Sequence, residues 1–256
     1  MRDPMKGRLD GTVALVTGAS SGIGAATALA LAAEGAAVAL AARRTDRMEE
    51  LAAGIRERGG TALVLEADVT DEPQATAAVE RTVRELGRLD TLVNNAGVML
   101  LGPVEDAPLE EWRRMVDVNA LGLLYCARAA LPHLLRAASE RPRRVADMVN
   151  VSSVLGRVPR KGAAVYNLAK HGVVAFSDAL RQEVSERHVR VSVVEPGAVA
   201  TELSSHTRPE VREAMQPFTF ALPMEPEDIA DAVVYIVTRP WRMAVNEMLI
   251  RPTEMV

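Results

Sequence analysis

A tyrosine and a lysine stand four residues apart at Tyr166 and Lys170, in a stretch whose apolar spacing predicts a helix over 165–186. Residues at i and i+4 share one helix face, so both side chains project together. A phenol has an ordinary pKa near 10, and a neighbouring ammonium stabilises the phenolate and lowers that pKa. The pair therefore predicts an acid–base centre that protonates a carbonyl oxygen or deprotonates an alcohol.

Two further polar residues follow apolar runs. Ser153 comes just after 145–151, and Asn119 comes just after 115–118. The serine hydroxyl can hydrogen-bond a substrate oxygen, and the amide can anchor a water that passes protons to Lys170. Each residue alone has a simpler explanation, as surface packing for the Tyr–Lys pair and as a cap for Ser153 or Asn119. We interpret them as one catalytic set because they occur together behind a dinucleotide-type turn.

That turn is the segment TGASSGIG at 17–24, which follows an apolar run and opens a helical pattern. Glycines let backbone N–H groups approach a pyrophosphate, and a helix N-terminus favours its charge. Ser20 and Ser21 add hydroxyl donors. The glycine spacing is G-x-x-x-G-x-G, and the alternative is an ordinary strand-to-helix turn. The strand–turn–helix context favours a dinucleotide site.

Arg43 and Arg44 follow the second predicted strand, where an NAD site usually carries a carboxylate for the ribose 2′-hydroxyl. Guanidinium groups instead suit a 2′-phosphate through bidentate charge-assisted bonds. We therefore expect NADP(H) rather than NAD(H). The alternative is that both arginines simply begin a solvated helix.

Two other strand ends should reach the same edge of the sheet. Asp68 can accept a hydrogen bond from the adenine amino group, or it can serve a turn, since Asp is common there. Asn94-Asn95-Ala96-Gly97 ends the fourth predicted strand.

Short apolar runs alternate with longer helical patterns almost to the end of the chain. This alternation predicts parallel strands joined by crossover helices, with both sheet faces covered. We expect strands at 12–17, 36–42, 62–66, 91–94, 145–151, 189–195 and 247–250, and helices at 22–34, 46–58, 72–86, 109–115, 121–135, 165–186 and 226–238. The polar, basic segment 136–144 is expected to be a solvated loop.

Composition narrows the class of protein. The 256 residues are 48% hydrophobic and 25% charged, and the net charge is −4, which gives no general attraction for nucleic acid or an anionic membrane. Cys126 is the single cysteine, and no His or Cys pair has metal-ligand spacing, so neither a disulfide nor a metal is expected. The N-terminus has no apolar signal region, and the apolar run 25–42 is interpreted as helix, turn and strand. We expect a cytoplasmic protein.

Together, TGASSGIG, Asp68, NNAG, Asn119, Ser153, Tyr166-x-x-x-Lys170 and Pro196-Gly197 with Thr201 resemble the short-chain dehydrogenase/reductase family over nearly the whole chain. The resemblance implies a three-layer, doubly wound Rossmann fold with a seven-stranded parallel sheet, in one domain over 1–256. It also implies a homotetramer or a homodimer.

The same resemblance implies a catalytic tetrad of Asn119, Ser153, Tyr166 and Lys170. By similarity, Lys170 also bonds the nicotinamide ribose, and Arg43 stands where NADP-preferring members often carry a basic residue. The expected cofactor contacts are Gly18, Ser20, Ser21, Gly22, Ile23, Gly24, Arg43, Arg44, Asp68, Val69, Asn95, Ala96, Gly97, Tyr166, Lys170, Pro196, Gly197, Val199 and Thr201.

Substrate specificity is expected in the segment 202–223, which contains Phe218 and Phe220. These rings can form an apolar lid over the nicotinamide or simply pack that lid onto the body. His206 can touch a polar substrate or stay solvated. Arg157 or Arg160 can bind a substrate carboxylate, while the expected apolar lining is Met99, Leu100, Leu155 and Val158.

Three narrower stretches, 98–106, 129–135 and 250–253, resemble NADPH-dependent aldehyde reductases and NADP-dependent 3-hydroxy acid dehydrogenases within the family. The leading hypothesis is therefore an NADPH-dependent reductase of a small-molecule aldehyde or ketone. The alternatives are an NADP-dependent dehydrogenase that oxidises a 3-hydroxy acid, and a dinucleotide-binding regulator without turnover. The expected partners are the substrate and further copies of this chain, with no nucleic acid and no membrane. Apolar residues on 165–186, among them Val173, Val174, Phe176, Ala179 and Leu180, are candidates for that self-contact.

Overall fold

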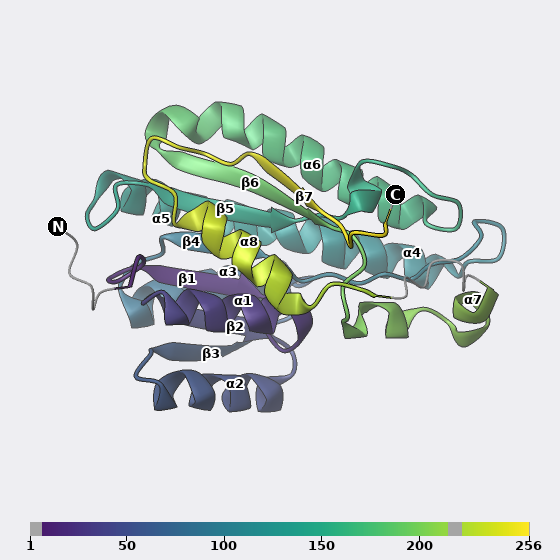
Figure 1. The fold of residues 1–256 in the computed structure, drawn as a ribbon, viewed down its shortest axis with the longest axis horizontal. Coiled ribbons are helices and arrows are strands. Elements are labelled where there is room, and N and C mark those ends of the chain that lie inside the picture. The colour runs from purple at the N-terminus through teal and green to yellow at the C-terminus, as the bar shows by residue number, and fades with distance from the viewer. Residues whose placement is uncertain (1–6, 215–221, 256) are drawn as a thin grey trace.

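The computed structural model describes residues 7–214 and 222–255, and its elements alternate between strand and helix along the chain (Figure 1). The strands are β1 Val13–Thr17, β2 Ala37–Ala42, β3 Ala62–Glu66, β4 Thr91–Asn94, β5 Ala146–Val151, β6 Val189–Pro196 and β7 Glu247–Ile250. The α-helices are α1 Gly22–Ala33, α2 Thr45–Glu57, α3 Glu72–Leu86, α4 Leu109–Val116, α5 Gly122–Ser139, α6 Ala164–Val184, α7 Pro209–Ala214 and α8 Pro226–Val237. A π-helical turn, Asp117–Leu121, joins α4 to α5, and short 3-10 turns occupy Val154–Gly156, Ser185–Arg187 and Glu202–His206.

All seven strands pair in parallel, in the order β3-β2-β1-β4-β5-β6-β7. This confirms the expected seven-stranded doubly wound sheet. The order reverses between β1 and β4, because the chain winds first toward one edge and then toward the other. In open α/β sheets, ligands bind outside the carboxyl ends of the strands at such a reversal.

Alternating side chains of each strand feed two separate cores. Ala14 and Val16 of β1 join one core with residues of α1, α2 and α8, while Leu15 joins the other with α3, α5 and α6. The result is a three-layer sandwich, with α1 and α8 lying against one face of the sheet in Figure 1. Because both faces are covered, β1, β2, β5 and β6 are almost wholly buried, whereas the edge strands β3 and β7 are partly exposed.

Most expected elements agree with the structure to within a few residues. The bounds of α3, and those of β3, β4 and β7, are as predicted, and Asp71 caps α3 by accepting a hydrogen bond from the Gln74 N–H at 2.9 Å. The run 25–42 is indeed a helix, a turn and a strand. The helical run Leu109–Ser139 has the length and composition of a membrane-spanning helix, and 39% of its most apolar window is buried inside the protein.

The expectation of a solvated loop over 136–144 was wrong in two places. Residues 136–139 continue α5, where Ala137 and Ala138 enter the core. Arg143 is only 11% exposed and donates to Asp147 at 2.8 Å, because Asp147 is fully buried in β5 and requires cationic partners. Arg190 of β6 is its second partner, at 2.7 Å.

The apolar residues expected to meet a partner along α6 mostly face inward. Val173 and Leu180 are buried and Phe176 packs against the core beneath α6, because the sheet requires cover from that helix. The large apolar side chain that α6 does expose is Leu168, which is 67% exposed.

Candidate active site

The glycine-rich turn between β1 and α1 lies against the end of β4. Gly18 and Gly22 both have positive φ, at 66° and 53°, which only glycine adopts readily. A Cβ at Gly24 would lie 2.4 Å from the Gly18 carbonyl oxygen and 2.5 Å from Asn95 Nδ2. The glycine spacing therefore permits close packing of helix α1 on the turn and on the neighbouring strand.

The start of α1 offers unoccupied donors. Ser21 stands at the N-cap without bonding the helix through its side chain, and the first turn contains no acidic residue. The backbone N–H groups at that end, with the hydroxyls of Ser20 and Ser21, form a donor set that suits a pyrophosphate. The residues present therefore fit a dinucleotide, which Gly22, Ile23 and Gly24 would approach through their backbone.

Thr17 joins the two strands at the point of reversal, and sequence analysis did not single it out. Its hydroxyl accepts from the backbone N–H of Asn95 at 3.0 Å and of Ala96 at 3.1 Å. Asn95 Nδ2 in turn donates to the Thr17 carbonyl at 3.0 Å. These bonds place Asn95, Ala96 and Gly97 beside the glycine-rich turn, as predicted. A threonine directly before the first glycine is the signal that could have indicated this role.

Arg43 and Arg44, adjacent in sequence, have different surroundings. Arg44 donates to Ser20 Oγ at 3.1 Å and to Ser21 Oγ at 2.7 Å, so its guanidinium lies at the glycine-rich turn. Arg43 is 65% exposed and approaches Asp68 at 3.7 Å. Arg47, one turn along α2, adds a third guanidinium that sequence analysis missed, although its spacing from Arg44 placed both on one helix face.

Asp68 follows β3 and closes a turn. Its Oδ1 accepts from the N–H and the hydroxyl of Thr70, at 3.0 and 2.8 Å. Burial opposes ionisation here, but the bonds from Thr70 lower the pKa of the carboxyl on balance. The turn role is therefore present, while Oδ2 stays near Arg43. Val69 is buried, and Gly122 of α5 leaves room for its side chain.

Tyr166 and Ser153 meet at the carboxyl ends of β4 and β5. Tyr166, on the first turn of α6, is 4% exposed and lies among Val98, Leu100 and Met115. Ser153 caps the 3-10 turn that follows β5, where its Oγ accepts from the Leu155 N–H at 3.1 Å. Burial raises the pKa of Tyr166 to about 12, against which a hydrogen bond with Ser153 acts.

Lys170 lies one turn beyond Tyr166, on the same helix face. Its Nζ donates to the Val151 carbonyl at 2.8 Å and lies 5.8 Å from the centroid of the Tyr166 ring. Burial lowers the pKa of Lys170 to about 8. The net shift of the tyrosine pKa is upward, opposite in direction to the lowering expected from a neighbouring ammonium. Loss of water is the largest cause of the pKa shift of each group, since desolvation penalises the charged form.

Asn119 lies in the π-helical turn between α4 and α5, where sequence analysis expected a helix junction. Its amide donates to the carbonyls of Val98 and Met115 at 2.8 and 2.9 Å, and its Oδ1 accepts from the Val98 N–H at 3.1 Å. A Cβ at Gly97 would lie 3.0 Å from Asn119 Oδ1 and 3.8 Å from Lys170 Nζ. Asn119, Gly97 and Lys170 are therefore brought together, as predicted.

Ser152 and Gly156 fasten the Ser153 turn to α6, and sequence analysis missed both. Ser152 Oγ donates to the Lys170 carbonyl at 3.0 Å. A Cβ at Gly156 would lie 2.5 Å from Ser152 Oγ and 3.0 Å from that same carbonyl. Small residues here let the helix with Tyr166 and Lys170 pack tightly on the turn with Ser153. The Ser-Ser pair at a strand end was the available signal.

The segment after β6 returns to the glycine-rich turn. Pro196 ends the strand, and the Gly197 N–H donates to the Ile250 carbonyl at 2.7 Å. Val199 pairs with Met224 in an isolated parallel bridge, and Thr201 caps the next 3-10 turn. A Cβ at Gly22 would lie 3.0 Å from Thr201 Cγ2, so Thr201 contacts the start of α1.

The expected lid is described over 202–214, 222 and 223, whereas Phe218 and Phe220 lie outside the described residues. Thr207 Oγ1 donates to the Met99 carbonyl at 3.1 Å, and Arg208 pairs with Glu111 of α4 at 3.0 Å, so the lid is docked on the loop after β4. His206 is exposed, and partial burial and then Arg114 lower its pKa.

Two expectations about the substrate side are corrected. Arg157 is bound to Glu195, at 2.6 Å, and to Glu247, so two carboxylates already hold the guanidinium that was considered for a substrate. Val158 lies just after the 3-10 turn Val154–Gly156 and is 48% exposed, so it does not belong to the expected apolar lining. Met99, Leu100 and Leu155 do pack around Tyr166, as expected.

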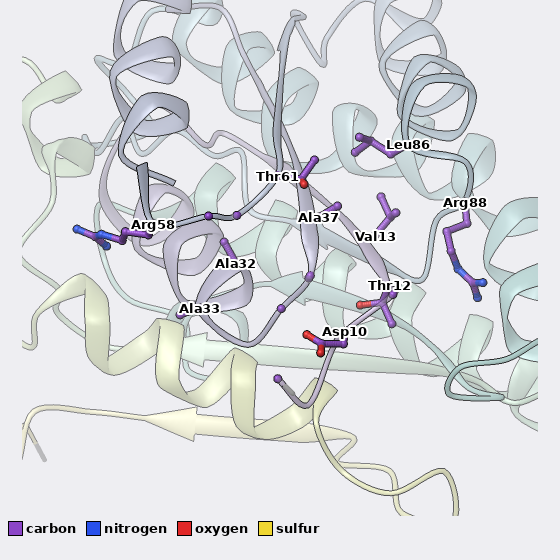
Figure 2. Close-up of a pocket in the computed structure, with 16 residues that line it drawn as sticks. Asp10, Thr12, Val13, Ala32, Ala33, Ala37, Arg58, Thr61, Leu86 and Arg88 are labelled. Atoms are coloured by element: carbon purple, nitrogen blue, oxygen red, sulfur yellow. The ribbon is translucent and has the colours of Figure 1, made fainter. Parts of the chain in front are cut away.

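Two hollows of very different size lie at opposite edges of the sheet. A cavity of about 10 Å³ at the start of α6 is lined by apolar residues that include Leu100, Trp112, Met115 and Val165. A hollow of about 620 Å³ lies at the opposite edge of the sheet, near the amino ends of β1, β2 and β3. Figure 2 shows that Arg58 and Arg88 stand at its two ends and do not converge. The candidate site residues lie at the carboxyl edge of the sheet and not among the residues that line this larger hollow.

This architecture and site define an oxidoreductase of the short-chain dehydrogenase class. The family model for short chain dehydrogenases matches residues 12–212, and the chain belongs to that family. It is an enzyme family that acts on CH–OH and carbonyl groups.

Two curated relatives show how widely the sequence is shared. The chain is 40% identical to a glycine betaine reductase of Emericella nidulans over 251 residues, which are 97% of this chain and 19% of that protein. The chain therefore spans about a fifth of that relative's length. It is 36% identical to an uncharacterised oxidoreductase of Staphylococcus saprophyticus, covering 94% of this chain and 96% of that one.

Solved structures of the same fold hold both nicotinamide cofactors. A short-chain dehydrogenase from Burkholderia cenocepacia in complex with NADP is 30% identical, with a TM-score of 0.83 over 95% of this chain and 98% of that one. The closed form of a serine dehydrogenase complexed with NADP+ is 30% identical, with a TM-score of 0.84 over 96% of each chain. A 3-ketoacyl-(acyl-carrier-protein) reductase from Brucella melitensis complexed with NADH is also 30% identical, with a TM-score of 0.84 over 97% of this chain and the whole of that one.

Proposed function

We propose that the chain is an NADPH-dependent reductase that converts an aldehyde or ketone to an alcohol. The observation that carries the proposal is the buried set of Tyr166, Ser153 and Lys170 at the carboxyl edge, beside a glycine-rich turn with Arg44 bound to it. An acid–base group, an oxygen-binding hydroxyl and a dinucleotide cradle are the parts that hydride transfer to a carbonyl requires.

In this proposal, Tyr166 is the general acid. Burial keeps its phenol protonated. Hydride addition turns the carbonyl oxygen into a strongly basic alkoxide, so the phenol can donate its proton to that oxygen while Ser153 hydrogen-bonds it. Lys170 binds the nicotinamide ribose and, when charged, favours the phenolate that proton donation leaves. The side chain of Asn119 is engaged with Val98 and Met115, so its support for the proton relay passes through the backbone of the π-helical turn.

NADPH supplies the hydride when bound, and the residues proposed to hold it are those expected from the sequence, Asp68 and Val69 included. Gly18, Ser20, Ser21 and Gly24 surround the expected pyrophosphate position. Arg44 is proposed to bind the 2′-phosphate with Arg43 beside it, and Pro196, Gly197, Val199 and Thr201 to flank the nicotinamide. NADP-bound relatives support this preference, and the NADH-bound relative shows that the fold itself does not impose it.

The test of the reaction is Tyr166→Phe, assayed with NADPH against a panel of aldehydes and ketones. Because general acid–base catalysis contributes about 10²–10⁴-fold, kcat should fall by at least about a hundredfold on every accepted carbonyl. Tyr235→Phe, on the exposed face of α8, is the matched control and should keep its activity. NADPH binding should survive both changes. Turnover near that of the wild type in Tyr166→Phe would refute the assignment.

A second candidate is an NADP-dependent dehydrogenase that oxidises a 3-hydroxy acid, which the likeness to a serine dehydrogenase favours. The same residues serve it, with Tyr166 acting as base. A panel of 3-hydroxy acids with NADP+, measured against aldehydes with NADPH, separates the two. A broad panel with tight NADPH binding and no turnover would instead favour a non-catalytic regulator.

The narrower likeness in 98–106, 129–135 and 250–253 leads us to propose a place in specialised metabolism, near the NADPH-dependent clavulanate-9-aldehyde reductase. The glycine betaine reductase relative adds a polar alternative substrate class.

We further propose one domain over 1–256 with a substrate lid within 202–223, a cytoplasmic location, and self-association as a homotetramer or homodimer. The exposed Leu124 of α5 and Leu168 of α6 support self-association.

A further inference from the structure

A carboxylate from the lid occupies the arginines at the proposed 2′-phosphate position. Glu202 begins the 3-10 turn Glu202–His206, and each of its two oxygens accepts from a different arginine. Oε2 lies 2.9 Å from Arg44 Nη1, and Oε1 lies 2.7 Å from Arg47 Nη1. Glu202 is thus held by two guanidinium groups from the start of α2.

The same Arg44 side chain also reaches the glycine-rich turn. Its Nη2 donates to Ser20 and Ser21, so one guanidinium links the cofactor turn to the lid. Arg47 and then Arg44 hold the pKa of Glu202 at about 2, so the carboxylate stays charged at neutral pH. Arg43 takes no part, since its partner is Asp68.

A carboxylate and a phosphate make the same kind of charge-assisted, bidentate bonds to guanidinium. The phosphate carries more negative charge and more acceptor oxygens, and its charge would repel the Glu202 carboxylate from the same guanidinium groups. A dinucleotide without a 2′-phosphate has no group at this position that competes with Glu202. The two cofactors therefore differ in whether Glu202 must leave.

We propose that Glu202 is a specificity-determining residue that competes with the 2′-phosphate for Arg44 and Arg47, so that NADP(H), and not NAD(H), detaches the first turn of the lid. This inference rests on the proposed NADP(H) preference, and it adds Arg47 to the 2′-phosphate site. The lid also contacts the loop after β4, through Thr207 and Met99. In this proposal, the cofactor that binds therefore affects how the lid covers the substrate site.

The first test is a fluorescence titration of wild type, Glu202→Gln and Arg47→Ala with NADPH and with NADH. Glu202→Gln removes the exposed ion pairs with Arg44 and Arg47, so the 2′-phosphate no longer has to displace them. NADPH binding should tighten by about threefold to tenfold, with NADH binding unchanged. Arg47→Ala should weaken NADPH binding alone. Glu49→Gln is the matched control, because it removes the same charge from an exposed pair with Arg56 on α2. It should change neither affinity.

The second readout is hydrogen exchange of the backbone in 202–206. In the wild type, NADP+ should speed this exchange and NAD+ should not, while in Glu202→Gln exchange should already be fast without cofactor. An unchanged ratio of NADPH to NADH affinity in Glu202→Gln, or weaker NADPH binding, would overturn the inference.

Arg44→Ala separates that failure from failure of the proposed function. One outcome is that the wild type prefers NADPH, that Arg44→Ala abolishes this preference, and that Glu202→Gln leaves it unchanged. In that case only the proposed role of Glu202 is wrong. If the wild type binds both cofactors equally and Arg44→Ala changes nothing, the proposed NADP(H) preference fails and this inference falls with it.

Discussion

At the scale of single residues, burial sets the protonation of the proposed catalytic groups. Tyr166 and Lys170 are each 4% exposed, and burial raises the pKa of the phenol to about 12 and lowers that of the amine to about 8. Both shifts favour the neutral form, because burial penalises charge. At neutral pH the pair therefore consists of a protonated phenol and a largely protonated amine.

The lowered pKa of Lys170 predicts a pH-dependent stability. Its folded pKa of about 8 lies below the ordinary 10.5, so the unfolded chain holds more protons between these values and stability rises with pH across that window. Lys170→Met lacks this rise. Urea unfolding at pH 7 and pH 10 should show the wild type gaining about 1–3 kcal/mol relative to Lys170→Met. A difference between the two proteins that stays constant with pH would contradict the burial of a charged amine.

At the scale of elements, the site depends on how closely α1 approaches β4. Gly24 is buried, and a Cβ at this position would lie only 2.4 Å from the Gly18 carbonyl oxygen and 2.5 Å from Asn95 Nδ2. Thr17 and Asn95 fasten the two strand ends that flank this approach. The dinucleotide turn is thus shaped by the neighbouring strand as well as by its own glycines.

Gly24→Ala should therefore destabilise the fold by about 1–3 kcal/mol, as overpacking does, and weaken NADPH binding. Thermal unfolding and a fluorescence titration measure the two effects. Gly54→Ala in α2 is the control, because a Cβ there meets no atom within 4 Å. It should stabilise the protein by about 0.5–1 kcal/mol through helix propensity. Equal behaviour of the two variants would show that close approach at Gly24 is unimportant.

At the scale of the whole molecule, the two edges of the sheet have separate tasks. The amino edge is fastened by the buried Asp147 with Arg143 and Arg190, and Arg190 also donates to the Met243 carbonyl at 2.7 Å. The carboxyl edge carries the proposed chemistry. Leu124 and Leu168 remain exposed on the layer formed by α5 and α6, which is the layer proposed for self-association.

Light scattering should accordingly give a mass that is a multiple of the single chain, with a tetramer expected. Leu168→Glu should shift the protein toward smaller species, because a charge there would be buried at the contact. Val104→Glu, at another exposed apolar side chain, should leave the mass unchanged. A monomeric wild type would refute self-association through this layer.

Local sequence patterns predicted the elements of the fold and the segments that are proposed to carry the chemistry. Apolar periodicity is local, so β3, α3, β4 and β7 were predicted to the residue, and the glycine-rich turn and the Tyr166–Lys170 pair each lie within one short segment. The continuous apolar runs also predicted a sheet covered on both faces.

Contacts between groups far apart in the chain could not be predicted from local sequence patterns. Arg47 and Glu202 are 155 positions apart, and Arg44 rather than Arg43 contacts the glycine-rich turn, because the exit of β2 turns the two side chains in different directions. The pKa directions of Tyr166 and Lys170 were also beyond sequence reasoning. Desolvation depends on every neighbour that excludes water, and those neighbours come from separate elements such as Val98 and Met115.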